Sequence, residues 1–226
     1  MSNLLATQKL IRKSIAKDQI ERWLQPDPHR VYRDLALDWA GILGSLIVVA
    51  WLKTWWIYGI SFLVIGFCQY ALFILGHDAL HNSLHPNKAV NDRLARWLVY
   101  GGMFMGMEDG RRNHLEHHRN LGTEIDPDRY LHTLSHKNSK TDFLLFCSGL
   151  ATFGKTLITV TPLGKITRQS AEAQTLNLGQ PKASEILTDY FQQRLSVLVI
   201  QILLISLFAL LGLPWWCYVL LWVAPI

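Results

Sequence analysis

Two short histidine-rich segments are the part of this sequence best suited to chemistry. His77 and His81 lie in the motif HDALH, and His114, His117 and His118 lie in the motif HLEHH. Residues three or four apart on a helix share one face, so each segment can present a row of imidazoles. Imidazole nitrogen is a common ligand of iron, copper and zinc. The two segments therefore predict a polynuclear metal site whose ligands are these five histidines.

Other titratable side chains near these segments are candidates for supporting roles. His85 would follow His77 and His81 on one helix face, but Pro86 comes next and favours a helix end, so His85 is only a further candidate ligand. Metal-bound imidazoles usually donate their second N–H to a carboxylate. The carboxylates available for that role are Asp78, Glu116, Asp126 and Asp128. For the last two, a turn around Pro127 is an equally good explanation.

The histidine segments lie beside apolar sequence, and the first directly follows apolar sequence of membrane length. Half of the 226 residues are hydrophobic, and residues 35–52 and 54–75 form two apolar stretches separated by Lys53. Each approaches the ~20 residues that a ~30 Å hydrocarbon core requires, so together they predict a transmembrane helical hairpin. A third stretch, residues 196–213, leads through Pro214 into residues 215–226, which make only about 18 Å of helix. We predict an all-α integral membrane protein with two transmembrane helical hairpins and a helical cap that carries the histidines.

The positions of the basic residues predict how the chain is oriented. Lys and Arg occur seven times before Leu35, once in the first hairpin turn, 14 times between His77 and Arg194, and nowhere after Arg194. The positive-inside rule then places the N-terminus and the histidine segments in the cytoplasm. The two turns on the far side each carry a tryptophan pair, which is typical of a membrane interface. Because membrane topology explains the basic charge, nucleic-acid binding is not favoured.

The remaining segments lack the length or the composition of a span. Residues 1–34 are polar and basic and predict a cytoplasmic N-terminal segment, either an interfacial helix or a solvated one. Residues 94–107 predict a re-entrant or interfacial segment, because they are apolar, short and rich in glycine. Residues 143–162 are expected not to span, and residues 167–189 to form a cytoplasmic helix or loop. The three cysteines show no paired spacing, which argues against a disulfide framework or a thiolate metal site.

The motifs resemble those of the membrane fatty acid desaturase superfamily, which also includes carotenoid ketolases and hydroxylases. HDALH is similar to that family's HxxxH box at the end of a transmembrane hairpin, and HLEHH is similar to its HxxHH box. The segment GTEIDPD at residues 122–128 resembles the family's DPD segment, and the likeness extends from about residue 38 to the end of the sequence.

The resemblance implies a desaturase-like membrane domain over residues 35–226. Its histidines would hold two non-haem iron ions, which activate O2 and remove hydrogen from a lipid acyl chain drawn from the membrane. The resemblance also implies an external electron donor of the ferredoxin or cytochrome b5 type, because the sequence contains no haem or iron–sulfur motif.

The sequence departs from the family's pattern at one point. The family carries a third histidine box after its fourth span, and this sequence ends within that span. We therefore expect a fragment of a longer protein, whose oxidoreductase activity belongs to the full-length form rather than to this chain alone. The alternatives are a carotenoid ketolase or hydroxylase and a non-catalytic membrane scaffold or partner subunit. A zinc protease is less favoured, because HDALH has Asp where the motif H-E-x-x-H needs Glu as general base.

Overall fold

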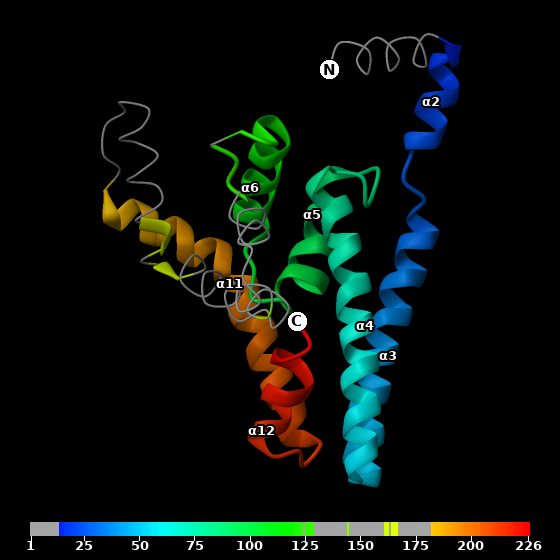
Figure 1. The fold of residues 1–226 in the computed structure, drawn as a ribbon, viewed down its shortest axis with the longest axis vertical. Helices are drawn as coiled ribbons and strands as arrows, with labels where there is room; N and C mark the ends of the chain where they lie inside the picture. Colours follow the sequence, from blue (N-terminus) through cyan, green and yellow to red (C-terminus); the bar gives the residue numbers. More distant parts are fainter. Residues whose placement is uncertain (1–13, 124, 129–143, 145–160, 163, 167–181) are drawn as a thin grey trace.

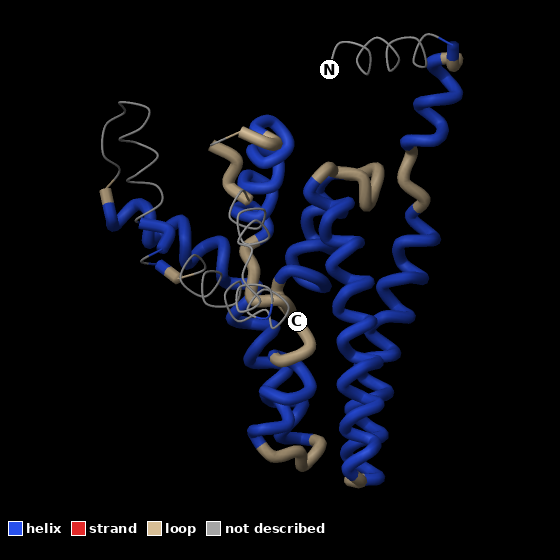
Figure 2. The backbone as a smooth tube through the Cα atoms, viewed as in Figure 1, coloured by secondary structure: helices blue, strands red, loops and turns tan. Residues whose placement is uncertain are grey.

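The structure of this chain is a computed structural model that describes residues 14–123, 125–128, 144, 161–162, 164–166 and 182–226. Every element of regular structure in that part of the chain is a helix, as Figure 2 shows. The α-helices are α2 (Lys17–Leu24), α3 (Pro28–Leu52), α4 (Trp55–Leu80), α5 (Lys88–Ala95), α6 (Met107–Asn120), α11 (Ala183–Leu210) and α12 (Trp215–Tyr218), and the π-helices are η1 (Arg96–Tyr100) and η3 (Val219–Val223). The all-α prediction is confirmed for these residues, whereas nearly all of residues 143–162 and most of 167–189 lie outside them.

The helices α3 and α4 are joined by a short turn at Lys53 and lie side by side (Figure 1). Asp27 caps the start of α3, where its Oδ1 accepts hydrogen bonds from the backbone N–H of His29 (3.0 Å) and Arg30 (3.4 Å). Lys53 ends α3 in the left-handed conformation, with φ of 50°. The two helices approach closely at Gly41, where an added Cβ would lie 2.7 Å from the Cys68 sulfur.

The helices extend beyond the apolar stretches. α3 begins at Pro28, before the stretch that starts at residue 35, and α4 runs past residue 75 to Leu80, as the helical spacing of His77 and His81 predicts. Likewise, α11 begins at Ala183 rather than at residue 196. The reason is physical, because an apolar stretch marks only the part of a helix that lies in hydrocarbon, while capping and turn residues decide where the helix ends.

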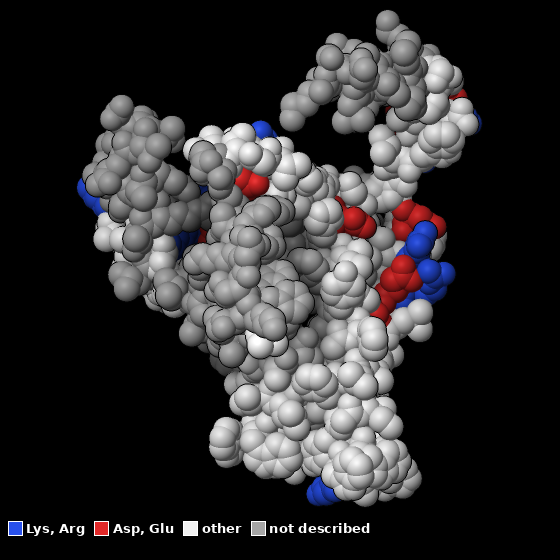
Figure 3. All heavy atoms as spheres, in the orientation of Figure 1, with Lys and Arg blue, Asp and Glu red and all other residues white. Residues whose placement is uncertain are grey.

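Among the described residues, three helical segments are long and apolar enough to cross a membrane: Lys17–Leu52, Trp55–Leu80 and Ala183–Leu210. Large apolar side chains on these helices face outwards, including Trp51, Phe67 and Leu210. The lower part of the molecule in Figure 3 is almost free of charged groups. Such a surface is costly in water and natural in lipid. α12 and η3 turn back along α11 but are too short to span, so the second transmembrane hairpin stays a prediction.

A buried polar network joins α4 to a second pair of helices, which consists of α11 and the short helices α12 and η3 that follow it. The Gln69 side chain of α4 donates to the Trp222 carbonyl (3.0 Å), and the Trp222 indole N–H donates to the Gly102 carbonyl (3.1 Å). Gln201 of α11 donates to the carbonyls of Gly101 and Gly102, each at 2.9 Å. Backbone groups away from water need such partners. The sequence pattern did not predict this network.

The segment between the histidine motifs follows a bent path over the end of α4. α5 and η1 lead into a turn at residues 101–106, in which Phe104 has a positive φ of 59°. The absence of a side chain at Gly76 lets η1 approach α4, because an added Cβ would lie 2.9 Å from Val99 and 3.2 Å from Tyr100. The predicted bend at residues 94–107 is therefore observed, and it brings α6 alongside the end of α4.

Candidate metal centre

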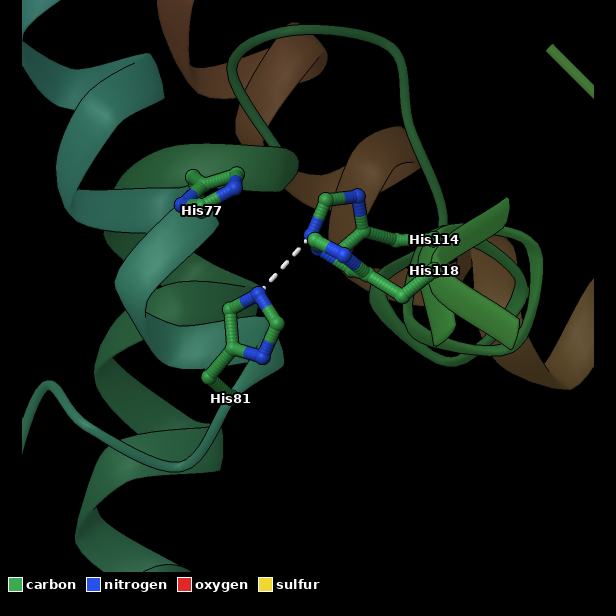
Figure 4. A group of neighbouring side chains, drawn as sticks. All are labelled: His77, His81, His114 and His118. Atoms are coloured by element: carbon green, nitrogen blue, oxygen red, sulfur yellow. Dashed lines mark hydrogen bonds between the residues drawn. The ribbon is translucent and has the colours of Figure 1, made fainter. Parts of the chain in front are cut away.

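The two histidine motifs lie on two different helices that meet at one end of the molecule. His77 is in the last turn of α4, and His81 is the C-cap residue that directly follows Leu80, the last residue of that helix. His114, His117 and His118 all lie in α6. Figure 4 shows His77 and His81 on one side, facing His114 and His118 on the other.

Four of these imidazoles form a compact group. One nitrogen from each of His77, His81, His114 and His118 lies within 4.8 Å of the others. The Nε2 atom of His114 lies 2.9 Å from Nε2 of His81 and 3.0 Å from Nε2 of His118. The ring centroids of His77 and His114 are 4.6 Å apart. Residues 33 positions apart in the chain are thus brought into direct contact.

This group fits a metal ion better than it fits hydrogen bonding alone. A neutral imidazole nitrogen either donates one proton or offers one lone pair, so His114 Nε2 cannot serve two neighbours equally well. A cation held among the four histidines would accept a lone pair from each of them. Nitrogen ligands with bonds of ~2.1 Å lie about 3.0 Å apart when adjacent and about 4.2 Å apart when opposite in an octahedral site. The spread of these nitrogen atoms is comparable.

The electrostatics of the group keep two of its members neutral. Burial lowers the pKa of His114 to about 4, and the neighbouring imidazoles His77, His118 and His81 contribute to the shift. Burial, followed by His77 and His118, also lowers the pKa of His81, against a smaller opposite effect of Asp78. Neutral imidazole is the form that binds metal. At pH 7 both side chains therefore have a free lone pair available.

His117 lies beside this group, not in it, and is held by the DPD segment. Its Nδ1 lies 2.7 Å from Oδ1 of Asp126, whose side chain is almost fully buried. That carboxylate also accepts the backbone N–H of Asp128 (2.9 Å) and of Gly122 (3.4 Å). The hydrogen bond from His117 lowers the pKa of Asp126 from its ordinary value. With Nδ1 engaged, Nε2 is the His117 atom left for a metal.

The other candidate residues are placed differently. His85 does not continue the helix face of His77 and His81, because α4 ends at Leu80, and that expectation is wrong. Its ring lies against Tyr32, and its Nδ1 accepts the backbone N–H of Asn87 at 3.0 Å. The carboxylate of Asp78 is 3.8 Å from His77 Nδ1.

Two further candidates lie on or against α6. Glu116 is half-buried between the histidines of the second motif. Asp128 accepts a hydrogen bond from Asn113 at 3.0 Å and lies 3.9 Å from His117 Nδ1. The DPD segment therefore folds back onto the helix that carries the second motif.

Sequence reasoning missed the residues that connect the two motifs. Arg111 of α6 donates a hydrogen bond to the Ala79 carbonyl at the end of α4, and Asn91 of α5 donates to the same carbonyl. Asp92 of α5 accepts a hydrogen bond from Arg111. In the sequence these residues lie among several charged and polar ones, and nothing in their spacing distinguishes them.

Comparisons with known proteins point to one family. The family model described as fatty acid desaturase matches residues 53–226. A chloroplastic sn-2 acyl-lipid omega-3 desaturase (ferredoxin) of Helianthus annuus is 29% identical over 119 residues, which is 53% of this chain and 26% of the relative.

Two cyanobacterial sn-1 acyl-lipid omega-3 desaturases (ferredoxin) are also similar. That of Synechocystis sp. is 30% identical over 57% of this chain and 34% of the relative, and that of Nostoc sp. is 35% identical over 38% and 24%. This chain thus matches about a quarter to a third of the length of these relatives. No solved structure matches it.

Proposed function

The chain belongs to the fatty acid desaturase family, and from this premise we propose that it provides two histidine boxes of a membrane-bound, O2-dependent acyl-lipid desaturase. The observation that carries the proposal is the four-histidine group at the end of a helix long enough to cross a membrane. A catalyst that acts on lipid tails needs its oxidant close to hydrocarbon, and α4 brings His77 and His81 to the end of such a span. The desaturase-like membrane domain would comprise residues 35–226, preceded by the N-terminal segment 1–34.

We assign the metal ligands to the five histidines of the two boxes. His77, His81, His114 and His118 would hold iron directly, with His117 offering its Nε2. When bound, two non-haem iron ions supply the redox chemistry that activates O2 for removal of hydrogen from an unactivated C–H bond. Additional ligands are required for two ions, since five imidazoles do not fill two coordination spheres.

The chain's own side chains have defined tasks in this scheme. Asp126 accepts the Nδ1 proton of His117, which fixes the tautomer and the direction in which Nε2 points. Burial of His114 keeps its imidazole neutral and ready to bind at physiological pH. Asp78, Glu116 and Asp128 are the remaining carboxylates that we expect to support the histidines.

The names of the relatives support an acyl-lipid substrate and a ferredoxin-type electron donor. Each of the three relatives described above is named as an acyl-lipid omega-3 desaturase that uses ferredoxin. We propose the same substrate class and a donor of that type here, with the histidine boxes and the N-terminus in the cytoplasm. A carotenoid substrate, as in ketolases and hydroxylases, is the alternative that the test must distinguish.

Product analysis tests the reaction. The open reading frame that contains this sequence is expressed in a host that makes β-carotene, and fatty acids and pigments are profiled with and without a co-expressed ferredoxin. We expect an additional double bond in membrane acyl chains that requires His81 and His114 and is unaffected by His29→Ala. His29 is an exposed histidine outside both boxes, which makes it the matched control. A new keto-carotenoid with unchanged acyl chains would overturn the acyl-lipid assignment.

Metal analysis of the purified chain tests the site without relying on activity. We expect bound iron that is lost in His77→Ala, His114→Ala and His118→Ala and retained in His29→Ala. Zinc in place of iron would contradict a desaturase and favour a hydrolytic metal site.

A further inference from the structure

Arg111 joins the helix of the second histidine box to the end of the helix of the first. Its Nη2 donates to the carbonyl oxygen of Ala79 at 2.8 Å, and its Nε donates to that of Leu80 at 3.1 Å. These two residues lie inside the HDALH motif, immediately before His81. Arg111 itself precedes His114 by three residues on α6. The side chain of Arg111, which lies about one helical turn before His114, therefore contacts the backbone of the first histidine box.

The carbonyls that Arg111 binds are among those that a helix end leaves without an intrahelical partner. The last four C=O groups of an α-helix lack the N–H of a following turn. At the end of α4, the Ala79 carbonyl accepts the backbone N–H of Asn82 at 3.0 Å, and it also accepts from the side chains of Arg111 and Asn91. The Leu80 carbonyl accepts from Arg111. Backbone hydrogen bonds of the following turn and these side-chain donors thus meet at the residues immediately before His81.

Asp92 holds the guanidinium group in place from the opposite side. Its Oδ1 accepts from Arg111 Nη2 at 2.6 Å and its Oδ2 accepts from Nη1 at 3.3 Å. Lys88 and Asn91 also donate to this carboxylate. Burial alone would raise the pKa of Asp92, but these hydrogen bonds outweigh it and hold the pKa well below its usual range. The carboxylate is therefore charged whenever the chain is folded near neutral pH.

The contact set requires the shape of arginine. The guanidinium group carries five N–H donors in a rigid plane, and here they are divided between two carbonyls and a carboxylate. A lysine has a single donor atom and cannot reach all three groups from one position. Both Arg111 and Asp92 have side chains about one-fifth exposed, at 17% and 21%, so water replaces these contacts poorly.

We propose that Arg111, held by Asp92, is a positioning residue that fixes the two histidine boxes at the separation a metal needs. It acts through Ala79 and Leu80 on His81 and through α6 on His114, and it touches no metal or substrate itself. The proposal rests on the proposed function only in taking both boxes to be metal ligands.

The test measures Co2+ binding to the chain in lipid nanodiscs, with the visible absorption bands of Co2+ as a record of coordination. Arg111→Lys is compared with Arg112→Lys, a matched control whose guanidinium group donates to Asp109 on the same helix. We expect about a 10- to 100-fold loss of Co2+ affinity and an altered spectrum in Arg111→Lys, as for other changes next to metal ligands. Arg112→Lys should bind and absorb like the parent chain.

A double-mutant cycle separates positioning from general destabilisation. In a background that lacks His114, His117 and His118, the boxes cannot share a metal, so Arg111→Lys should change the residual Co2+ affinity less than about two-fold. A loss of equal size in both backgrounds would overturn the proposal. Asp92→Asn provides a second route to the same result if Arg111→Lys folds poorly, and it should weaken binding in the parent background only.

The two proposals fail in different ways. If the parent chain binds no Co2+, the proposed metal site is wrong. If the parent binds Co2+ and Arg111→Lys binds it with the same affinity and spectrum, the metal site stands and the role of Arg111 is refuted.

Discussion

Acidification should destabilise the metal-free chain through His114. Burial and the neighbouring imidazoles hold its pKa at about 4, whereas a histidine in an unfolded chain has a pKa near ~6.5. Between these two values the unfolded state binds more protons than the folded state. The free energy of unfolding therefore falls as the pH drops through this window and is constant above it.

The size of the effect follows from the two pKa values. The pKa of His114 is ~6.5 in the unfolded chain and about 4 in the folded chain. Proton linkage therefore lowers the free energy of unfolding by about 1.4 kcal/mol between pH 8 and pH 5.5. The site is open to water on one side, which weakens the effect by solvent screening, so we expect about 1 kcal/mol. Binding of Co2+ should remove this dependence, because a metal-bound nitrogen takes up no proton until the metal leaves.

Unfolding in mixed micelles by titration with SDS measures this loss at pH 8 and pH 5.5. The parent chain is compared with His114→Gln, which keeps a polar side chain of similar reach but does not titrate. The parent should lose about 1 kcal/mol more than His114→Gln over this interval. His29→Gln should behave like the parent. Equal pH dependence in the parent and in His114→Gln would refute the reasoning.

Three further predictions concern residues that support the site. Asp126→Asn should lower Co2+ affinity about 10- to 100-fold by releasing His117, and calorimetric titration would show it; unchanged affinity would contradict the orienting role. Gln201→Leu should cost about 1–3 kcal/mol in the SDS titration, since the Gly101 carbonyl loses its side-chain donor and the Tyr218 hydroxyl loses its acceptor, and a cost near zero would argue against the network. Gly41→Val should cost about 1–3 kcal/mol because its side chain meets the facing cysteine, whereas Gly44→Val, with open space around it, should cost little.

That the two histidine motifs face each other could be predicted from local sequence because the determinants are local, although the predicted set of five included His117, which lies beside the group of four. His77 and His81 are four residues apart, as are His114 and His118, so helical geometry alone aligns each pair. The apolar stretch before the first motif predicts a membrane-spanning helix that ends at the membrane surface, where His77 and His81 lie. That the two pairs meet required only that the intervening chain be short and bent, which the glycines at residues 101, 102 and 106 indicate.

The supporting contacts could not be predicted in this way because they depend on how distant segments pack. Whether His85 joins the group depends on where α4 ends, and at that end Asn82 adopts a positive φ while Asn91 and Arg111 donate to the Ala79 carbonyl. The contact between His117 and Asp126 needs the chain to reverse after α6, where Gly122 adopts a positive φ of 79°. The spacing of residues in the sequence limits which contacts between distant segments are possible, but it does not determine which of them form.

Directional hydrogen bonds from polar side chains restrain the helix that carries the first histidine motif. Lipid tails are as apolar as leucine, so hydrophobic contacts alone give a membrane helix little preference for one rotation or height over another. α4 has directional hydrogen bonds at two levels, from Gln69 to the second pair of helices and from Arg111 to its last carbonyls. About ten residues separate these levels, which is ~15 Å of helix. Hydrogen bonds at these two levels oppose translation of α4 along its axis and rotation about it. A metal site needs that restraint because its ligands must stay within about 0.5 Å of their positions.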